Sequence, residues 1–314
     1  MLKKTVKVML GVVFLAVLVG VLNAVLLVPD LKKEGYVVAY RGGGSLVDYE
    51  TLQTTGCTAS SLKQSGVNTV ENTREAVAAS VAAGVDVVHL NVHRTRDNQL
   101  VVFHDWTLDC ATDGTGPLSE SDFADLEQID AGYGYTSDGG KTFPFRNKGF
   151  RISKLSDFYA LYPEQIFWLN LKNDDELSFN VLSSHLSSMS SFSRKNTTVI
   201  TSSAGVRWFD VNAPEVRVAS VGSVKSCGID YLIVGWAGIV PESCKNTLLL
   251  IPPSMTNYFW GFPEQLASRM QNHGTEVYLW SKHNAVNPDL VNLISDGVGI
   301  VTSDRDFIHS AQID

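Results

Sequence analysis

The chain begins with a long apolar run and continues with short hydrophobic segments that alternate with helical patterns. Residues 8–28 contain no charged side chain; three lysines precede them and Asp30 follows. A helix of this length, rising 1.5 Å per residue, crosses the hydrocarbon core of a bilayer. A cleavable signal peptide has a shorter apolar region followed by small residues. We therefore expect residues 1–33 to form one uncleaved transmembrane helix that anchors the protein to a membrane.

The flanking charges predict the orientation of this anchor. Lys3, Lys4 and Lys7 favour a cytoplasmic N-terminus, although Lys32 and Lys33 on the other side weaken the asymmetry. We expect a single-pass membrane protein whose remaining residues lie on the extracytoplasmic side, periplasmic or extracellular.

The rest of the chain predicts an α/β fold in which strands and helices alternate. We expect strands at 37–40, 85–92, 100–103, 165–171, 198–201, 216–221, 276–280 and 299–302, and helices at 71–83, 155–162, 176–190, 263–273 and 288–296. Two segments, 231–234 and 248–251, compete for the sixth strand of the alternating series. About eight strand–helix units over about 280 residues favour a (β/α)₈ TIM barrel over residues 34–314 rather than a doubly wound sheet.

The charge balance narrows the class of partner. The net charge is −8, and residues 1–33 carry five Lys and one Asp, so residues 34–314 have a net charge of −12. A domain this acidic repels polyanions at long range, so we expect no nucleic-acid partner. A local site can still bind one small phosphodiester, because salt screens the global field.

Four cysteines lie beyond the apolar run, and no two are spaced as a CxxC pair. An even number in an oxidising compartment is typical of disulfides, for which three pairings exist. We favour Cys57–Cys110 and Cys227–Cys244. Four small buried thiols are the alternative.

Polar residues follow several predicted strands, where the active site of a TIM barrel lies. Two pairs have a spacing of two residues, His89 with Asn91 and Asn170 with Lys172, so the members of each pair face the same way. His93 alternates in phase with His89 and Asn91, but it lies beyond the end of the predicted strand 85–92. We therefore interpret it as peripheral to the site. The candidate site residues are Tyr40, Arg41, His89, Asn91, His104, Asn170, Lys172 and Trp280.

These motifs resemble those of the glycerophosphodiester phosphodiesterase family. The family's His-Arg-Gly is matched by Tyr40-Arg41-Gly42, and its Glu-Asn-Thr is intact as Glu71-Asn72-Thr73. His89-Leu90-Asn91 stands where the family has Glu-x-Asp, and Asn170-Leu171-Lys172 where it has Glu-x-Lys. The family's His-Asp is His104-Asp105, and its closing strands resemble Trp280-Ser281 and 299–303. The resemblance covers about 37–308 and implies a (β/α)₈ barrel.

The resemblance implies hydrolysis of a glycerophosphodiester to an alcohol and glycerol phosphate. By position, Glu71, His89, Asn91 and Asn170 are the metal-ligand set for a divalent cation, Ca²⁺ or Mg²⁺ in the family. His104 and Tyr40 occupy the places of the two catalytic histidines, and Lys172 stabilises developing negative charge. Arg41 holds phosphate oxygens, and Trp280 covers the glycerol or alcohol part.

The chain departs from the family at four of these positions. His89, Asn91 and Asn170 replace carboxylates, and Tyr40 replaces a histidine. A neutral His suits zinc better than Ca²⁺ or Mg²⁺, so zinc or no metal is the alternative to the family's cation. Two hypotheses remain: a membrane-anchored phosphodiesterase with altered chemistry, and a catalytically inactive module that binds phosphate esters as a sensor or docking domain. A purely structural barrel would leave the residues at the strand ends unexplained.

Overall fold

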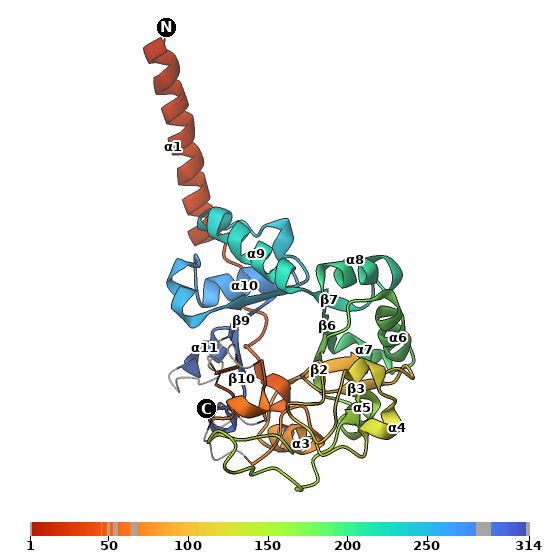
Figure 1. Ribbon diagram of the computed structural model, residues 1–314. Coiled ribbons are helices and arrows are strands. Elements are labelled where there is room, and N and C mark those ends of the chain that lie inside the picture. The colour runs from red at the N-terminus through yellow and green to blue at the C-terminus, as the bar shows by residue number, and fades with distance from the viewer. Residues whose placement is uncertain are drawn as a thin grey trace. The chain divides into compact units, whose positions relative to one another are not determined.

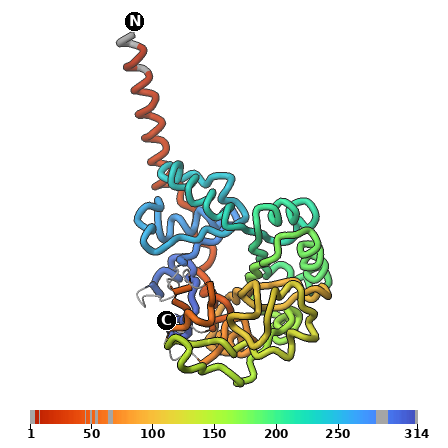
Figure 2. Tube along the Cα trace, in the orientation of Figure 1, coloured from red at the N-terminus to blue at the C-terminus, as the bar shows by residue number. Residues whose placement is uncertain are grey.

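The computed structural model describes residues 2–44, 46–48, 51–52, 56–63, 68–280 and 290–311 (Figure 1; the same course is traced as a tube in Figure 2). The chain forms two compact units. The first comprises Met1–Gly35, Gly222–Leu279 and Asn292–Gly299, and the second comprises Tyr36–Val221, Trp280–Val291 and Ile300–Asp314.

The fold is a (β/α)₈ barrel preceded by one apolar helix. Its eight parallel strands follow the order β7-β6-β5-β2-β1-β10-β9-β8. Their bounds are β1 Val37–Ala39, β2 Val87–Arg94, β5 Ile166–Leu171, β6 Thr197–Ile200, β7 Arg217–Ala219, β8 Leu248–Ile251, β9 Glu276–Trp280 and β10 Val298–Thr302. Most of their residues are buried, as expected for parallel strands covered by helices.

Helices connect these strands, and several begin at polar side chains that cap them. Asp175 accepts a hydrogen bond from the Ser178 backbone N–H at the start of α6, and Ser202 accepts one from Gly205 at the start of α8. The helices are α3 Arg74–Ala82, α5 Leu155–Leu161, α6 Glu176–Ser187, α7 Ser191–Lys195, α8 Ser203–Asn212, α9 Val221–Val234, α10 Glu264–Asn272, α11 Asn292–Ser295 and α12 Arg305–Ser310.

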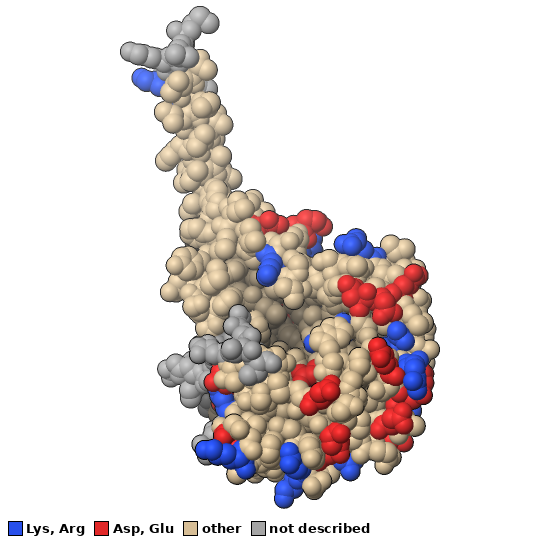
Figure 3. All heavy atoms as spheres, viewed as in Figure 1, with Lys and Arg blue, Asp and Glu red and all other residues tan. Residues whose placement is uncertain are grey.

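The N-terminal helix α1 spans Leu2–Leu26 and belongs to the first unit. Over Thr5–Leu26 it is long and apolar enough to cross a membrane, and none of its most apolar window is buried. Figure 3 shows it as a column that is almost free of charged side chains. Length and composition alone do not separate an anchor from a signal sequence.

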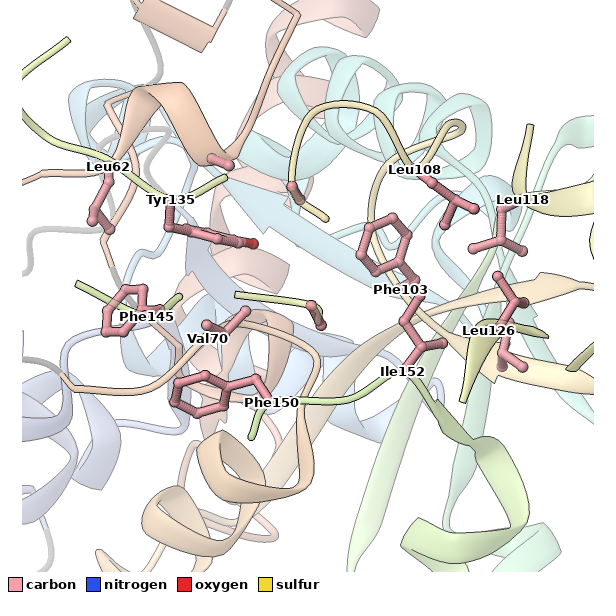
Figure 4. Packing of buried hydrophobic residues seen from close by; sticks show 14 residues of the cluster. Leu62, Val70, Phe103, Leu108, Leu118, Leu126, Tyr135, Phe145, Phe150 and Ile152 are labelled. Atoms are coloured by element: carbon pink, nitrogen blue, oxygen red, sulfur yellow. The ribbon is translucent and has the colours of Figure 1, made fainter. Parts of the chain in front are cut away.

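A second hydrophobic core lies in the segment that follows β2. β3 (Leu100–Val102) pairs antiparallel with the end of β2, and β4 (Ser153–Lys154) pairs with β3. The stretch between them folds over a cluster that includes Phe103, Leu108, Tyr135 and Phe150 (Figure 4). It also contains the short helices η3 (Leu118–Glu120) and α4 (Phe123–Leu126), which the polar composition did not predict.

Both favoured disulfides are present, Cys57–Cys110 and Cys227–Cys244. The first ties the loop after β1 to the segment after β3, and the second joins α9 to η5 (Glu242–Cys244). No cysteine of the described chain is free.

The competition for the sixth strand is resolved in favour of 248–251, which is β8. Residues 231–234 form the last turn of α9, because Tyr231 and Cys227 are buried on one helical face, four residues apart. The predicted strand at 216–221 is too long by one residue at its start and two at its end, since β7 spans Arg217–Ala219 and α9 begins at Val221. Part of the predicted helix 288–296 lies outside the described residues, and α11 covers only Asn292–Ser295.

Candidate active site

The turn after β1 directs Arg41 into the protein. Tyr40, Arg41 and Gly42 form a single 3₁₀ turn, η1, in which Arg41 has a φ of 52°. The Arg41 backbone N–H donates to Nδ1 of His89 (3.2 Å), and its carbonyl accepts from the Asn72 N–H (2.7 Å). These two bonds offset the cost of a left-handed conformation in a residue other than glycine. A β-carbon on the following Gly43 would lie 2.0 Å from Oγ of Ser80, so only glycine fits there.

Arg41 forms a buried ion pair with Glu71. Its Nη1 lies 3.0 Å from Oε1 and 2.9 Å from Oε2 of the carboxylate, and both side chains are about 5% exposed. Gly44 allows this approach, because a β-carbon there would lie 2.3 Å from Cα of Glu71. Breaking a buried pair by removing one partner costs about 3–5 kcal/mol in proteins generally. The charge of Glu71 is therefore already balanced within the protein.

The Glu-Asn-Thr motif is a rigid turn, and the predicted helix at 71–83 begins later than expected. Asn72 has a φ of 58°, and its side chain accepts from the Asn91 N–H (2.9 Å) and donates to Oδ1 of Asn91 (3.3 Å). Thr73 then caps α3, which starts at Arg74. The motif fixes Glu71 at the end of β1 and ties Asn91 of β2 to the same turn.

His89 is a neutral, buried side chain. Burial and the nearby charge of Arg41 lower its pKa to about 3. Because Nδ1 accepts a hydrogen bond from the Arg41 N–H, the ring proton is on Nε2. The Tyr40 ring stacks on the imidazole, with centroids 4.8 Å apart and 21° between the planes. The two rings that replace a carboxylate and a histidine of the family thus pack on each other.

His104 is oriented by two side chains. Its Nδ1 lies 2.7 Å from Oδ1 of Asp105 and 3.2 Å from Oγ1 of Thr58, and Thr58 also donates to Asp105 (2.8 Å). Burial and Arg41 lower the pKa of His104, and the Asp105 hydrogen bond acts in the opposite direction. Burial would raise the pKa of Asp105, but the hydrogen bonds from His104 and Thr58 outweigh it and leave the pKa lowered. With Nδ1 engaged, Nε2 is the nitrogen of His104 left for proton transfer.

Lys172 adds a second cation at the end of β5. Its backbone N–H donates to the carbonyl of Val92, which aligns it with the end of β2. Burial and the charge of Arg41 lower the pKa of the Lys172 ammonium. Its Nζ lies 5.3 Å from the ring centroid of Trp106, a cation–π contact.

The interpretation of His93 as peripheral is wrong, because β2 extends to Arg94 and includes it. His93 is fully buried, its Nε2 lies 3.4 Å from the His104 carbonyl, and its ring meets Trp106 edge-on. Burial is the main reason why its pKa falls to about 3. His93 therefore supports the backbone that carries His104.

The structure brings most of the predicted residues together. Asn91 and Asn170 are paired across β2 and β5, and charge interactions link Arg41, His104 and Lys172. Trp280 is half-buried at the end of β9, and no side-chain contact joins it to this group within the described part of the chain. Ser281 lies outside the described residues.

Sequence reasoning missed Thr58, Trp106 and Tyr135. Tyr135 comes from the second core and lines a small void together with Glu71, His104 and Asp105. Burial raises the pKa of Tyr135 well above its usual value. Thr58 and Trp106 are each next to a residue that the sequence singled out, Cys57 and Asp105. That adjacency was the only signal, and it is a weak one.

The donor set at the predicted metal position does not match a hard cation. Both oxygens of Glu71 accept from Arg41, Oδ1 of Asn91 accepts from Asn72, and Nδ1 of His89 accepts from a backbone N–H. The Lys172 ammonium, which is close enough to interact with Arg41 and Glu71, further disfavours a metal cation. Among the described residues, no group of three or more His, Cys, Asp or Glu side chains is placed to hold a metal.

The chain is similar in sequence and fold to known phosphodiesterases. The sequence model of the glycerophosphoryl diester phosphodiesterase family matches residues 56–197. A glycerophosphodiester phosphodiesterase of Caldanaerobacter subterraneus is 24% identical over 246 residues, which cover 77% of this chain and 91% of the relative. An uncharacterised protein of Mycobacterium tuberculosis is 34% identical over 103 residues, covering 32% of this chain and 34% of that protein.

Solved structures of the same kind share the fold. The glycerophosphoryl diester phosphodiesterase domain of that Mycobacterium tuberculosis protein has a TM-score of 0.63 at 18% identity, covering 90% of this chain and 99% of the domain. A phosphodiesterase of Oleispira antarctica, in complex with the product sn-glycerol-3-phosphate, has a TM-score of 0.58 at 19% identity and covers 90% of this chain and 98% of its own. The family's sequence model lies over the residues that carry Glu71, His104 and Lys172, and together with these relatives it supports the assignment of this chain to the glycerophosphodiester phosphodiesterase family.

Proposed function

We propose that this chain hydrolyses a glycerophosphodiester to an alcohol and glycerol phosphate without a resident divalent cation. The observation that carries the proposal is the grouping of Arg41, Lys172 and an oriented His104 in one buried site. Lys172 supplies a cation in addition to the Arg41–Glu71 ion pair, and a low-dielectric site strengthens its pull on a phosphate. The acidic charge of the remaining surface does not oppose this, because it is screened.

The proposed chemistry rests on this chain's own side chains. Lys172 and Arg41 hold the non-bridging phosphate oxygens. His104 Nε2 takes a proton from the attacking water as the new P–O bond forms, and the resulting imidazolium is stabilised by Asp105. The P–O bond to the alcohol breaks as the Tyr40 hydroxyl gives its proton to the departing oxygen. Tyr40 then regains a proton from solvent and His104 releases one to it. Trp280 covers the glycerol or alcohol part.

The family's enzymes generally depend on a divalent cation, and the proposal departs from that rule. It is supported by the engaged oxygens of Glu71 and by the amides at Asn91 and Asn170, which lack the charge that holds Ca²⁺ or Mg²⁺. Zinc is the other candidate because His89 is a nitrogen donor, but Nδ1 is already hydrogen-bonded. Metal analysis of protein purified without a chelator tests this point directly.

A binding module without turnover is the second candidate. Its support is specific: Tyr40, stacked on His89, stands where the family has a catalytic histidine, and a phenol is a poorer base than an imidazole at pH 7. The phosphate cradle would then serve a sensor or docking role.

One assay separates these candidates. We expect purified protein to release glycerol phosphate from sn-glycero-3-phosphocholine in the presence of EDTA, and His104→Gln to slow release by about 10²–10⁴-fold. His309→Gln, an exposed histidine on α12, is the control and should match the parent. A rise in melting temperature with no product would favour the binding module. Neither product nor shift would contradict both.

A restoration variant tests the metal assignment. Tyr40→His, His89→Glu, Asn91→Asp and Asn170→Glu together rebuild the family's pattern. We expect this variant to bind Ca²⁺ in calorimetry while the parent does not, because three added carboxylates offset the charges of Arg41 and Lys172. Equal Ca²⁺ affinity in parent and variant would show that the parent's donors were sufficient.

We also propose that residues 1–33 anchor the protein as a single pass through a membrane and that residues 34–314 form the extracytoplasmic barrel. The length and exposure of α1 support this, as do the lysines before it. The two disulfides fit an oxidising compartment. The protein should therefore remain with membranes after carbonate extraction, with its mass unchanged from the uncleaved chain.

A further inference from the structure

The last turns of α1 do not stand clear of the protein but pack against η4 (Gly235–Ala237). A β-carbon on Gly20 would lie 2.8 Å from the Trp236 ring, so the helix backbone touches that side chain. Nδ2 of Asn23 donates to the Ala237 carbonyl (2.7 Å), and an Arg269 side-chain N–H donates to the Ala24 carbonyl. All of these residues belong to the first unit.

This packing fixes the depth of η4 relative to the membrane. Gly20 lies six residues before the end of α1 at Leu26, about 9 Å along the helix axis. If α1 spans a bilayer up to its last turns, the residues beside Gly20 lie within the headgroup and outer acyl region. Trp236 and Ile239 must then enter the membrane together with α1.

The surface next to this contact has the composition that such a position requires. Ile229 and Ile233, four residues apart on α9, are 59% and 64% exposed, and Ile239 is 51% exposed. Val221 and Lys225 continue the same helical stripe at the same spacing. Figure 1 shows α9 beside the C-terminal end of α1.

The polar groups around this stripe either form hydrogen bonds within the protein or are of the kinds found at the membrane–water interface. Trp260, 50% exposed, donates from Nε1 to the Leu232 carbonyl (3.3 Å), which places the indole next to Ile233. Asp230 accepts from the Ser243 hydroxyl. Tryptophan rings and lysines are typical of the headgroup level, where a lysine extends its ammonium towards lipid phosphates.

We propose that the α9 surface, formed by Ile229, Ile233, Trp236, Ile239 and Trp260, lies in the interfacial layer of the membrane that α1 enters. The proposal rests on the proposed anchor. It adds that the protein contacts the membrane through the α9 surface as well as through α1, and that this second contact is monotopic. An open groove of about 700 Å³ between α1 and η4, lined almost entirely by apolar side chains, is then filled by lipid acyl chain.

Depth-dependent quenching on the full chain tests this. Because the four native cysteines are paired, a new cysteine at Ile233 or Ile239 can be labelled with a fluorophore. Val211→Cys on α8, where the valine is 79% exposed, is the matched control. The protein is reconstituted into phosphatidylcholine–phosphatidylglycerol vesicles that carry spin-labelled lipids. We expect at least about twofold stronger quenching at positions 233 and 239 than at 211, as for groups 5–10 Å below the headgroups.

The other outcomes overturn the proposal in distinguishable ways. If the protein floats with vesicles but none of the three labels is quenched, the anchor stands and the α9 surface does not touch lipid. If labels at 233 and 239 are shielded from aqueous iodide yet not quenched by lipid, another protein copy covers that surface. If the protein does not float with vesicles, the anchor proposal fails and this inference fails with it.

Discussion

At the residue scale, hydrogen bonds between neighbouring groups engage the side chains at the candidate metal-ligand positions. Glu71 neutralises Arg41, His89 accepts from the backbone of Arg41, and Asn91 is held by Asn72. Each exchange of a carboxylate for a neutral group removes negative charge that would attract a divalent cation. Lys172 and the paired Arg41 remain, and we propose that these two side chains bind a phosphate.

The Asp105 carboxylate should control the protonation of His104. Its hydrogen bond raises the pKa of His104 against the effect of burial, so Asp105→Asn should lower that pKa further. The acid limb of the pH–rate profile should move to lower pH, and the maximal rate should fall because the imidazolium loses its partner. NMR titration of the His104 Cε1–H measures the shift. Asp109→Asn, on the same segment, serves as the control, and an unmoved titration would exclude this role.

His93 should make the fold sensitive to acid. Its folded pKa of about 3 lies below the unfolded value of about 6.5, so the unfolded chain binds more protons and stability falls as pH drops from 6.5 towards 3. Between pH 7 and pH 5 this histidine alone accounts for a loss of up to about 2 kcal/mol. His93→Asn should reduce that loss in urea unfolding measured at both pH values. His309→Asn should leave the pH dependence unchanged; an equal effect of both variants would contradict the assignment.

At the element scale, the strands were easier to predict than the helices and the loops. Runs such as 165–171 and 276–280 are buried on both faces, so continuous hydrophobicity marks them clearly. α9 was missed because it is apolar on its exposed stripe as well as its buried one, and it therefore resembles a strand. The helix at 71–83 started late because side-chain hydrogen bonds of Asn72 and Thr73 override local propensity.

The site residues at the strand ends could be predicted from the periodicity of the strands. Thr58 and Tyr135 could not, because their positions depend on how the loops pack, and no periodic pattern reveals that.

The Cys57–Cys110 disulfide should support both stability and the site. It closes a loop with a sequence separation of 53 and holds Thr58 against Asp105. Replacing both cysteines by serine should lower the free energy of unfolding by about 4 kcal/mol on the chain-entropy model. It should also weaken the His104-dependent rate, because Thr58 is released.

The second disulfide provides the matched comparison. Cys227–Cys244 has a sequence separation of 17 and belongs to the first unit, whereas the site residues belong to the second. Replacing both of these cysteines by serine should cost about 3 kcal/mol and leave the rate unchanged. Thermal unfolding and glycerol phosphate release measured on both variants separate the two effects, and an equal loss of rate would show that Thr58 is not the cause.

At the scale of the whole molecule, charge and hydrophobicity are distributed unevenly along the chain. The first 33 residues carry a net charge of +4 and the remaining residues −12. A positive N-terminal flank is retained on the cytoplasmic side of a membrane, and disulfides form on the other side. Both rules agree with the proposed single pass through a membrane at the apolar run, although they depend on different residues.

Accessibility in intact cells should therefore differ between the two ends of the chain. A cysteine introduced at Val211, exposed on α8, should react with a membrane-impermeant maleimide added from outside. A cysteine at Thr5, before the apolar run, should react only after the cells are permeabilised. The triple substitution Lys3→Glu, Lys4→Glu and Lys7→Glu makes the N-terminal flank negative, so that Lys32 and Lys33 become the positive flank of the apolar run. A fraction of the chains should then insert in the opposite orientation and expose Thr5→Cys to the reagent outside. Such inversion would also trap the barrel in a reducing compartment, where Cys57–Cys110 would not form. If the parent's Val211→Cys reacts only after permeabilisation, the extracytoplasmic placement is wrong, and the oxidation state of Cys57 would then have to be explained without an oxidising compartment.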